Sequence, residues 1–486
     1  MIELEQVSYI YPHTVQKALN NLSFSLPRGK CVLVTGPSGA GKTTLCLASA
    51  GVLHHEYGGK KEGRVTLGGR DISTYSSLSE VARTIGIVFD DAEAQMIFTT
   101  VEEEILSALE YRGLAAEVVE DRLAAIMEKT HLTELRHRSP HHLSGGQKQR
   151  VALAATLALG NDILILDEPT SELDERATTR IVDILRTLKK EGTTILLIEH
   201  KFGHFKDIVD TLVVMENGMI RAEGSPDNVL ADERMGKIVI ADFSGIRTAG
   251  AEQNAGSVPD KNPAPGMVVS VKDLVYSYEK LRALDSINLE IAAGEFVAIV
   301  GENGSGKTTL VKHFNGLLLP ESGTVTIAGT DTRLSSTTEL SRLVGLVFQN
   351  PDHMFFADTV FEEVAFGPRN LNLADSDAII RSALDEVNLG HTRDLYPRWL
   401  SRGERQRLAI ACVIAMQPRI IILDEPTTGL DGNEARQVMT VLKKLQKKGH
   451  TIIIITHNKE IAENCADRIL RMESGRIISD TRTGGA

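Results

Sequence analysis

Short apolar runs rich in β-branched residues alternate along the chain with amphipathic stretches. The runs CVLVTG, EFVAIVG, ILILD, IIILD and TIIIIT are apolar at nearly every position, whereas ATTRIVDILRTLKKEG at 177–192 spaces its apolar residues along one helix face. Continuous apolar strands separated by helices are typical of a parallel sheet that is covered on both faces. The pattern therefore predicts an α/β fold with a buried parallel sheet.

This pattern occurs twice. GPSGAGKTTL at 36–45 returns at 301–310 as GENGSGKTTL, ILILDEPTSELD at 163–174 returns at 420–431 as IIILDEPTTGLD, and TTILLIEHK at 193–201 returns at 450–458 as HTIIIITHN. The first motif repeats after 265 residues and the second after 257, so the first copy has eight additional residues in its early half. A tandem duplication is expected.

The stretch between the two copies is rich in Gly, Pro and Ala and poor in large apolar residues. Such a composition is typical of a flexible linker. The predicted organisation is one domain at 1–243, a linker at 244–266 and a second domain at 267–486.

Composition narrows the class of protein. The chain has 486 residues and a formal net charge of −12, which argues against sequence-independent binding of nucleic acid over a broad surface. The N-terminus lacks the layout of a signal peptide, and the longest apolar runs fall far short of the roughly 20 residues that span a bilayer. We expect a soluble protein whose role at a membrane would require a partner.

Cysteine and histidine usage argues against a disulfide framework or a metal cluster. The four cysteines are scattered, without metal or redox spacing: Cys31, Cys46, Cys412 and Cys465. We expect buried small side chains in a reducing compartment. Three neighbouring histidines are interpreted as an exposed polar turn rather than a metal site: His137, His141 and His142.

The pattern G-x-x-x-x-G-K-[ST] follows an apolar strand and opens a helical stretch in both copies, which is the context of a phosphate-binding loop. Glycines let backbone N–H groups turn toward phosphate oxygens, the lysine places an ammonium on the β- and γ-phosphates, and the threonine offers a hydroxyl to Mg²⁺. The predicted loop residues are Gly36, Pro37, Ser38, Gly39, Ala40, Gly41, Lys42, Thr43 and Thr44, and Gly301, Glu302, Asn303, Gly304, Ser305, Gly306, Lys307, Thr308 and Thr309.

Adjacent carboxylates end a later strand in each copy, as Asp167 and Glu168 and as Asp424 and Glu425. Ligands of open α/β sheets bind at this edge. The aspartate can hold Mg²⁺ through water, and the glutamate can orient and deprotonate an attacking water. The alternative is a solvated acidic loop, but the phosphate loops upstream favour the catalytic interpretation.

HHLSGGQKQR at 141–150 and RWLSRGERQR at 398–407 form a further repeated motif. Together with the phosphate loops, the LDEPT stretches, SELD and TGLD, and a histidine after the final strand, it resembles the nucleotide-binding subunits of ABC transporters over nearly all residues outside the linker. The resemblance implies two tandem P-loop ATPase domains of the α/β class, each with a mainly parallel sheet core, an antiparallel β subdomain and a helical signature subdomain. It also implies that the two domains pair head to tail, with each ATP between the phosphate loop of one domain and the signature of the other.

The resemblance also implies individual roles. The adenine-stacking residues would be Tyr11 and Tyr278, the signature residues Ser144, Gly145, Gly146, Gln147, Ser401 and Gly403, and the residues of the loop between sites Asp174 and Asp431. The Mg²⁺ ligands would be Thr43, Asp90, Asp167, Thr308, Gln349 and Asp424. The catalytic residues would be Glu425, His457 and Gln349 in one site and Glu168 and His200 in the other. A buried structural histidine is the alternative for His200, but its spacing matches that of His457.

Two substitutions fall in the same implied site. Arg402 replaces a signature glycine, and Asp90 stands where the second copy has Gln349. Both belong to site one, which would combine the first phosphate loop with the second signature. We predict that site two carries most of the hydrolysis and that site one binds ATP but turns it over poorly. The alternative is that Asp90 serves as a hard oxygen ligand for Mg²⁺ and keeps site one active.

FQNPDHMFFADTVFEEVAFGPRNLNL at 348–373 resembles the corresponding segment of energy-coupling factor and cobalt/nickel importer ATPases, and 89–114 resembles it more loosely. The resemblance implies a peripheral protein on the cytoplasmic face of the membrane. Its partners would be a transmembrane coupling protein and a substrate-binding membrane component, with a vitamin, a vitamin precursor or a transition-metal ion as cargo. Six residues would flank the groove for a partner helix, or belong to the core: Met96, Ile97, Phe98, Met354, Phe355 and Phe356.

Two other classes stay open. A soluble twin ATPase acting on ribosomes or nucleic acid is the main rival, although the short Gly/Pro-rich linker and the lack of a cysteine cluster favour the transporter. An ATP-binding module without turnover is the third class, and the retained Glu425, Gln349 and His457 argue against it.

Overall fold

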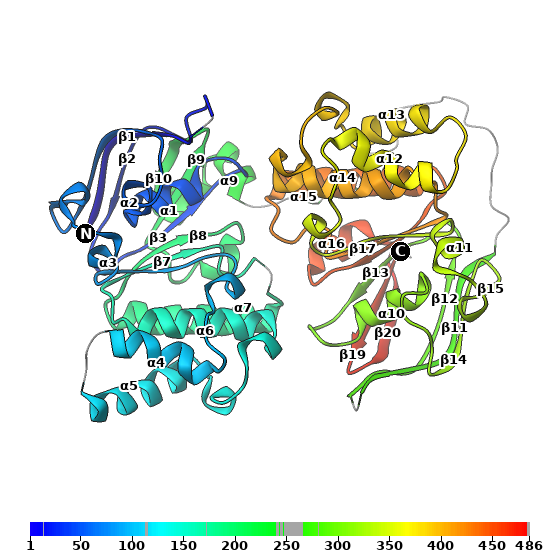
Figure 1. Ribbon diagram of the computed structural model, residues 1–486, viewed down its shortest axis with the longest axis horizontal. Helices are drawn as coiled ribbons and strands as arrows, with labels where there is room; N and C mark the ends of the chain where they lie inside the picture. The colour runs from blue at the N-terminus through cyan, green and yellow to red at the C-terminus, as the bar shows by residue number, and fades with distance from the viewer. Residues whose placement is uncertain are drawn as a thin grey trace. The chain divides into compact units, whose positions relative to one another are not determined.

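The computed structural model describes residues 1–12, 14–111, 115–171, 173–239, 243, 246, 266–279 and 281–483. The chain divides into two compact units, Met1–Ala241 and Asp242–Ala486, called domain 1 and domain 2 below. Each unit contains a four-stranded and a six-stranded sheet (Figure 1). The predicted linker at 244–266 lies outside the described residues except for Ile246 and Gly266, so its bounds stay a prediction.

Domain 1 carries ten strands and nine α-helices within its described residues. The strands are β1 (Ile2–Ile10), β2 (Leu19–Leu26), β3 (Cys31–Thr35), β4 (Lys60–Leu67), β5 (Arg70–Asp71), β6 (Ile85–Val88), β7 (Ile163–Asp167), β8 (Thr194–Ile198), β9 (Thr211–Glu216) and β10 (Met219–Gly224). The helices are α1 (Lys42–Ser49), α2 (Val52–His55), α3 (Leu78–Val81), α4 (Val101–Tyr111), α5 (Ala116–Lys129), α6 (Gly145–Ala158), α7 (Glu175–Lys190), α8 (Pro226–Leu230) and α9 (Glu233–Val239).

Domain 2 has ten strands and seven α-helices within its described residues. The strands are β11 (Met267–Tyr278), β12 (Leu281–Ala292), β13 (Phe296–Val300), β14 (Ser322–Ile327), β15 (Thr330–Asp331), β16 (Val344–Val347), β17 (Ile420–Asp424), β18 (Thr451–Ile455), β19 (Arg468–Glu473) and β20 (Arg476–Arg482). The helices are α10 (Lys307–Phe314), α11 (Thr337–Ser341), α12 (Val360–Asn370), α13 (Ser376–Glu386), α14 (Arg402–Ile414), α15 (Gly432–Lys447) and α16 (Lys459–Cys465).

The two domains have one topology. The six-stranded sheets run in the orders β10-β9-β3-β8-β7-β6 and β20-β19-β13-β18-β17-β16, and the smaller sheets in the orders β2-β1-β4-β5 and β12-β11-β14-β15. All neighbours in the larger sheets are parallel except the edge strands β10 and β20, and the smaller sheets are antiparallel. The predicted α/β fold with a parallel core and an antiparallel subdomain is confirmed.

The central strands are apolar at consecutive positions because both faces of the sheet are covered. In domain 1, Val32 and Val34 face a core shared with α1 and the antiparallel sheet, whereas Leu33 faces a second core shared with α7. Figure 1 shows α1 and α7 on opposite sides of this sheet. Because β3 and β7 both run parallel to β8 between them, their carboxyl ends lie at one edge of the sheet, where the phosphate loop begins.

The helical subdomain of domain 1 is formed by α4, α5 and α6 around its own apolar cluster, which includes Ile105, Leu123 and Val151.

No helix among the described residues is long and apolar enough to cross a membrane. Cys31, Cys46 and Cys465 are buried as expected, whereas Cys412 is only partly buried.

Candidate active sites

Each phosphate loop leaves a central parallel strand and enters a helix. The loop after β3 ends at Gly41 and the loop after β13 at Gly306, where φ is 96° and 98°. A Cβ atom would lie 2.4 Å from the carbonyl oxygen of Ala18 in the first case and 2.6 Å from that of Ala283 in the second. Only glycine fits both the left-handed backbone and the close approach at these positions.

The loop lysines are buried within their own loops. The Nζ atom of Lys42 donates to the carbonyl oxygens of Gly36 and Pro37 at 2.9 and 3.0 Å, and that of Lys307 donates to Gly301 and Glu302 at 2.8 Å each. Because each ammonium is held by carbonyl oxygens of its own loop, it is positioned to pair with phosphate oxygens bound there.

The strand-end aspartates lie beside the threonines that open the loop helices. Asp167 and Asp424 are 3% and 7% exposed, and Thr308 Oγ1 donates to Asp424 Oδ2 at 2.7 Å. Burial, and after it the charge of Glu168, raise the pKa of Asp167 to about 7, although a hydrogen bond from Thr43 opposes the shift. Burial likewise raises the pKa of Asp424. The protein thus keeps two carboxyl groups where ionisation is unfavourable unless a cation compensates.

These groups fit a hard divalent cation. The Oδ1 atom of Asp167 is buried without a hydrogen-bond partner among the described residues, which is unusual for a carboxylate oxygen. Carboxylate and hydroxyl oxygens that approach a phosphate loop are the ligands that Mg²⁺ takes in nucleotide sites. Thr43 and Asp167 in domain 1, and Thr308 and Asp424 in domain 2, are the residues that could hold it.

The adjacent glutamates contact the histidines that follow the next strand. His200 Nε2 lies 3.1 Å from Glu168 Oε1, and His457 Nδ1 lies 2.9 Å from Glu425 Oε2. Glu168 and Glu425 have φ angles of 48° and 49°. This left-handed step turns each carboxylate away from the strand direction and toward the histidine. Both domains therefore place a general-base candidate and a proton-bearing ring together.

The signature segments form the N-termini of α6 and α14. Ser144 and Ser401 are the N-cap residues of capping boxes, in which the serine N–H donates to Gln147 Oε1 at 2.9 Å and to Glu404 Oε2 at 2.8 Å. A Cβ on Gly429 would lie 2.2 Å from Arg402 Cζ. The guanidinium of Arg402 thus lies against the backbone of its own domain, next to the LDEPT segment.

The signature glycines lie close to the following helices. A Cβ on Gly146 would lie 2.6 Å from the Cβ of Ala177, and a Cβ on Gly403 would lie 2.5 Å from the Cδ of Glu434. Asp174 and Asp431 cap these helices, accepting the N–H groups of Ala177 and Glu434 at 2.8 Å. Each signature therefore packs against the loop that was predicted to lie between the sites.

The remaining predicted residues are more exposed. Tyr11 is partly buried, and its hydroxyl lies 3.3 Å from Thr44 Oγ1 beside the phosphate loop, whereas Tyr278 is 44% exposed. Asp90 and Gln349 are exposed residues two positions after β6 and β16. The charge of Asp90 contributes to the raised pKa of Asp167.

Three buried glutamates were missed by the sequence reasoning. Glu199 Oε1 accepts the N–H of Thr170 at 3.0 Å, and its Oε2 accepts the N–H of His200 at 3.0 Å. The carboxylates of Glu104 and Glu363 each accept two backbone N–H groups, which belong to the residues seven and six positions earlier in an apolar segment. The contact of Glu199 with Thr170 spans 29 positions, so no local pattern identifies it, whereas the signal for Glu104 and Glu363 is that both copies have a glutamate at the same position.

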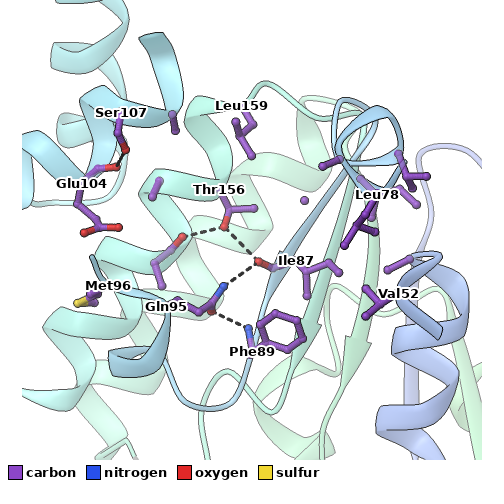
Figure 2. Close-up of a pocket in the computed structure, with 18 residues that line it drawn as sticks. Val52, Leu78, Ile87, Phe89, Gln95, Met96, Glu104, Ser107, Thr156 and Leu159 are labelled. Carbon is purple, nitrogen blue, oxygen red and sulfur yellow. Dashed lines mark hydrogen bonds between the residues drawn. The ribbon is translucent and has the colours of Figure 1, made fainter. Parts of the chain in front are cut away.

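The apolar segments held by these two glutamates are partly exposed. Ile97 is 82%, Phe98 39% and Phe356 66% exposed, whereas Phe355 is buried. Met96 lines a cavity of about 380 Å³ in domain 1 that lies between β6, α4 and α6 (Figure 2). The predicted groove residues thus divide into exposed side chains and core side chains.

In this cavity, Gln95 braces the loop that follows β6. Its Oε1 accepts the N–H of Phe89 at 2.8 Å, and its Nε2 donates to the carbonyl oxygen of Ile87 at 3.3 Å (Figure 2). The apolar wall includes Val52, Leu78 and Leu159.

No metal-binding cluster occurs among the described residues, and His141 instead pairs with Glu93 Oε1 at 3.7 Å.

Each domain therefore holds an ammonium over a glycine loop, a buried carboxylate beside a hydroxyl, and a glutamate against a histidine. Together these groups can bind the phosphates of a nucleoside triphosphate, hold its cation and activate a water. The fold and the site define a P-loop ATPase in each half of the chain.

Comparison with known proteins identifies the family of this chain. The chain matches the ABC transporter family over residues 19–171 and 284–428, which is more than half of its length. It belongs to the ABC transporter ATP-binding proteins, with two fused ATPase domains, and is an ATPase of the kind that is coupled to transport.

Relatives and solved structures include fused and single-domain proteins. A Methanosarcina mazei protein with the provisional name ABC transporter ATP-binding protein is 49% identical over 492 residues, covering 100% of this chain and 95% of its own. A Caldanaerobacter subterraneus relative of similar provisional name is 36% identical, covering 95% of this chain and 88% of its own. The structure of cbiO1 from Clostridium perfringens, described as part of the ABC transporter complex cbiONQ, shares 37% identity with a TM-score of 0.43 and covers 45% of this chain and 89% of its own.

Proposed function

We propose that the protein hydrolyses ATP to energise an importer of the energy-coupling factor type, with a vitamin, a vitamin precursor or a transition-metal ion as cargo. The observation that carries the proposal is the exposed apolar segment of Ile97 and Phe98, which Glu104 anchors beside the cavity of domain 1. An apolar groove next to an exposed apolar segment suits an amphipathic helix of a membrane partner. Such a partner would hold the protein at the cytoplasmic face of the membrane.

Hydrolysis is proposed to use the residues that each domain brings together. Lys42 and Lys307 bind the β- and γ-phosphates, and Glu168 and Glu425 orient and deprotonate the attacking water. Mg²⁺, when bound by the Asp–Thr pairs, neutralises charge that develops on the transferred phosphate. His200 and His457 donate hydrogen bonds to the γ-phosphate and keep the glutamates oriented.

The two ATP sites are proposed to be composite and unequal. Family architecture supports a head-to-tail pairing in which site two combines Lys307 and Glu425 with the signature at Ser144. Site one then combines Lys42 and Glu168 with the signature at Ser401. Asp90 and the altered second signature both fall in site one, so site two performs most of the turnover.

The test is recovery of membrane partners in detergent. The tagged full chain is purified from its native host in parallel with Ile97→Asp and Phe356→Asp, which place a charge in the proposed docking segments. Each variant is expected to lower the amount of integral membrane protein that copurifies by about tenfold. Leu334→Asp is the matched control, since Leu334 is 85% exposed on a different part of domain 2.

The rival function gives a different result in the same material. A chain that sediments with ribosomes, and whose membrane recovery is unaffected by Ile97→Asp and Phe356→Asp, would contradict the transporter proposal. The net charge of −12 supports the expectation that ribosomes stay free of it.

A further inference from the structure

The segment that leads from α1 into β4 is longer than its counterpart in domain 2. Gly51 and Gly63 are 12 positions apart, whereas the equivalent Gly316 and Gly323 are 7 positions apart. Gly63 and Gly323 correspond, because a Cβ on them would lie 2.5 and 2.3 Å from a carbonyl oxygen in the bulge of β1 and β11 respectively. The longer segment of domain 1 contains an aromatic residue, Tyr57, whereas the shorter one, LLLPES at 317–322, contains none.

Tyr57 forms an aromatic corner with Tyr11. The centroids of the two rings are 6.1 Å apart, and the ring planes meet at 79°. Tyr11 also contacts Tyr9, with centroids 4.8 Å apart and planes at 90°. Tyr9 is 1% exposed, whereas Tyr57 is 45% exposed. The corner of Tyr11 and Tyr57 is therefore the part of this aromatic cluster that a ligand can reach.

Backbone contacts hold Tyr57 in this place. The hydroxyl of the buried Tyr9 donates to the carbonyl oxygen of Gly58. Gly59 has a φ of 115°, and a Cβ there would lie 2.4 Å from the carbonyl oxygen of Ile10. Only glycine combines this positive φ with so close an approach. The residues that follow Tyr57 are thus fixed against the end of β1, directly before Tyr11.

The aromatic corner lies beside the phosphate loop of its own domain. The hydroxyl of Tyr11 is 3.3 Å from Oγ1 of Thr44, in the first turn of α1. A nucleotide whose phosphates lie on this loop would carry its base toward the corner. Because the ring planes of Tyr11 and Tyr57 are nearly perpendicular, a base that stacks on one ring meets the other ring at its edge. Both arrangements are favourable between aromatic groups.

The described part of domain 2 offers a different surface. Tyr278 contacts the ring of Tyr276 at 5.1 Å, and Tyr276 in turn contacts His313, which is fully buried. The segment before β14 approaches β11 with a carboxylate, since Glu321 Oε1 accepts the N–H of Ser277 at 3.0 Å. Tyr278 is thus flanked by a carboxylate on the neighbouring residue, where Tyr11 is flanked by a second exposed ring.

We propose that Tyr57 recognises the base of the nucleotide at the domain 1 phosphate loop, together with Tyr11, and makes this site more selective for a purine than the site of domain 2. This inference rests on the proposed function, because that function assigns the loop to ATP. A purine covers more of two aromatic rings than a pyrimidine does, so Tyr57 favours adenine over cytosine nucleotides. The corner and the loop belong to one domain, so binding of ADP tests the proposal whatever the pairing of the domains.

The test is calorimetric titration of the full chain with Mg-ADP. A Lys307→Ala background leaves one phosphate loop with its lysine, that of domain 1. Tyr57→Ala is expected to raise the dissociation constant for ADP about tenfold, because removal of a ring that contacts a base weakens binding by this order. Tyr57→Phe keeps the ring and should leave the constant within about twofold of its original value.

Two further probes separate contact with the base from support of the loop. CDP should bind Tyr57→Ala only about threefold more weakly, because the smaller base buries less area. Inorganic pyrophosphate has no base and should bind Tyr57→Ala as it binds the parent. Leu319→Ala, in a Lys42→Ala background, is the matched control, because Leu319 is an exposed apolar residue of the equivalent segment. Its dissociation constant for ADP should stay unchanged.

Four results would overturn the proposal: an unchanged ADP constant for Tyr57→Ala, an equal loss for pyrophosphate, an equal loss for Tyr57→Phe, or a comparable loss for Leu319→Ala. The lysine variants separate these results from failure of the proposed function. If Lys42→Ala removes one of two bound ADP molecules but Tyr57→Ala has no effect, the role of Tyr57 alone is wrong. If neither Lys42→Ala nor Lys307→Ala lowers the amount of bound ADP, the assignment of the loops to ATP is wrong, and the proposed function falls with it.

Discussion

In domain 1 the strand β8 leads into Glu199 and His200, whereas in domain 2 the equivalent strand β18 leads into Thr456 and His457. Glu199 is 1% exposed, and its carboxylate accepts both the backbone N–H and the hydroxyl of Thr170, in the loop after β7. Within the part of the chain that the structure describes, the Thr456 hydroxyl instead accepts the backbone N–H of Asn458, two residues later, at 3.1 Å. The loops that carry His200 and His457 are thus held by different hydrogen bonds, although both histidines contact their glutamates.

The difference shows where the duplicated halves have diverged. Topology and the Glu–His and Asp–Thr contacts are shared, since they depend on strand ends that both sheets place alike. The side chains that differ surround the sites: Asp90 and Gln349, Glu199 and Thr456, and Ala177 and Glu434. Exchanging or neutralising these groups tests how far the two sites differ in function.

The largest expected effect comes from the general bases. Glu425→Gln keeps the shape of the side chain but removes the base, so ATP turnover should fall about 10²–10³-fold. Glu168→Gln should lower turnover only a few-fold if site one contributes little. Steady-state phosphate release from the purified full chain measures both variants, with nucleotide binding as the control for folding. Equal losses would contradict the asymmetry.

Asp167 should give a pH-dependent effect on stability. Its pKa of about 7 lies above its usual value, so the stability cost of ionising it in the folded state grows as pH rises from about 4 to 7. In EDTA at pH 8, Asp167→Asn should therefore raise the free energy of unfolding by about 2–4 kcal/mol, and at pH 5 by less than half as much.

Calorimetric melting temperatures at the two pH values measure this gain. Asp162→Asn is the matched control, because Asp162 is exposed at the opposite end of β7. A gain that is the same at pH 5 and pH 8 would show that Asp167 does not titrate in this range. Added Mg²⁺ should reduce the gain, since the cation compensates the charge that the variant lacks.

The sequence predicted the parts of the fold and site that depend on local patterns. Apolar runs identified the parallel strands, and the glycine spacing identified loops in which Gly41 has a left-handed φ of 96°. The equal spacing from Asp to His in the two copies favoured a functional role for His200 and His457, and the structure places each of them against a strand-end glutamate.

Contacts between distant residues were not predicted. Glu199 meets Thr170 across 29 positions, and Ser401 meets Glu434 across 33. A single charged residue carries no local signal of burial, because its partner is set by how two loops pack. Only a difference between the copies, such as Ala177 against Glu434, marks such a position in the sequence.

Glu199 should contribute to the stability of domain 1 more than Thr456 does to that of domain 2. Glu199→Gln leaves donors of Thr170 and His200 facing an amide, so the free energy of unfolding should fall by about 1–3 kcal/mol. Thr456→Val, which removes a single acceptor, should lower it by about 1 kcal/mol. Urea unfolding at neutral pH compares the two, and a larger loss for Thr456→Val would reverse the comparison.

The smallest expected effect concerns an ion pair of opposite polarity in the two domains. Lys129 at the end of α5 pairs with Glu191 after α7, with Nζ–Oε2 at 2.6 Å, and at the equivalent positions Glu386 pairs with Lys448. Both pairs tie the helical subdomain to the helix after the LDEPT segment, and both are partly exposed. Such pairs contribute up to about 1 kcal/mol.

Reversing one charge of this pair should therefore lower the free energy of unfolding only slightly, and reversing both charges should leave it nearly unchanged. Lys129→Glu places a second carboxylate beside that of Glu191 and should lower the free energy of unfolding by about 0.5–1 kcal/mol at low salt. Adding Glu191→Lys copies the polarity of domain 2 and should restore the loss to within a few tenths. Thermal melts in low and 1 M salt make the measurement, because screening should abolish both effects. A double variant no more stable than Lys129→Glu would mean that the surroundings of each pair, rather than the pair itself, select its polarity.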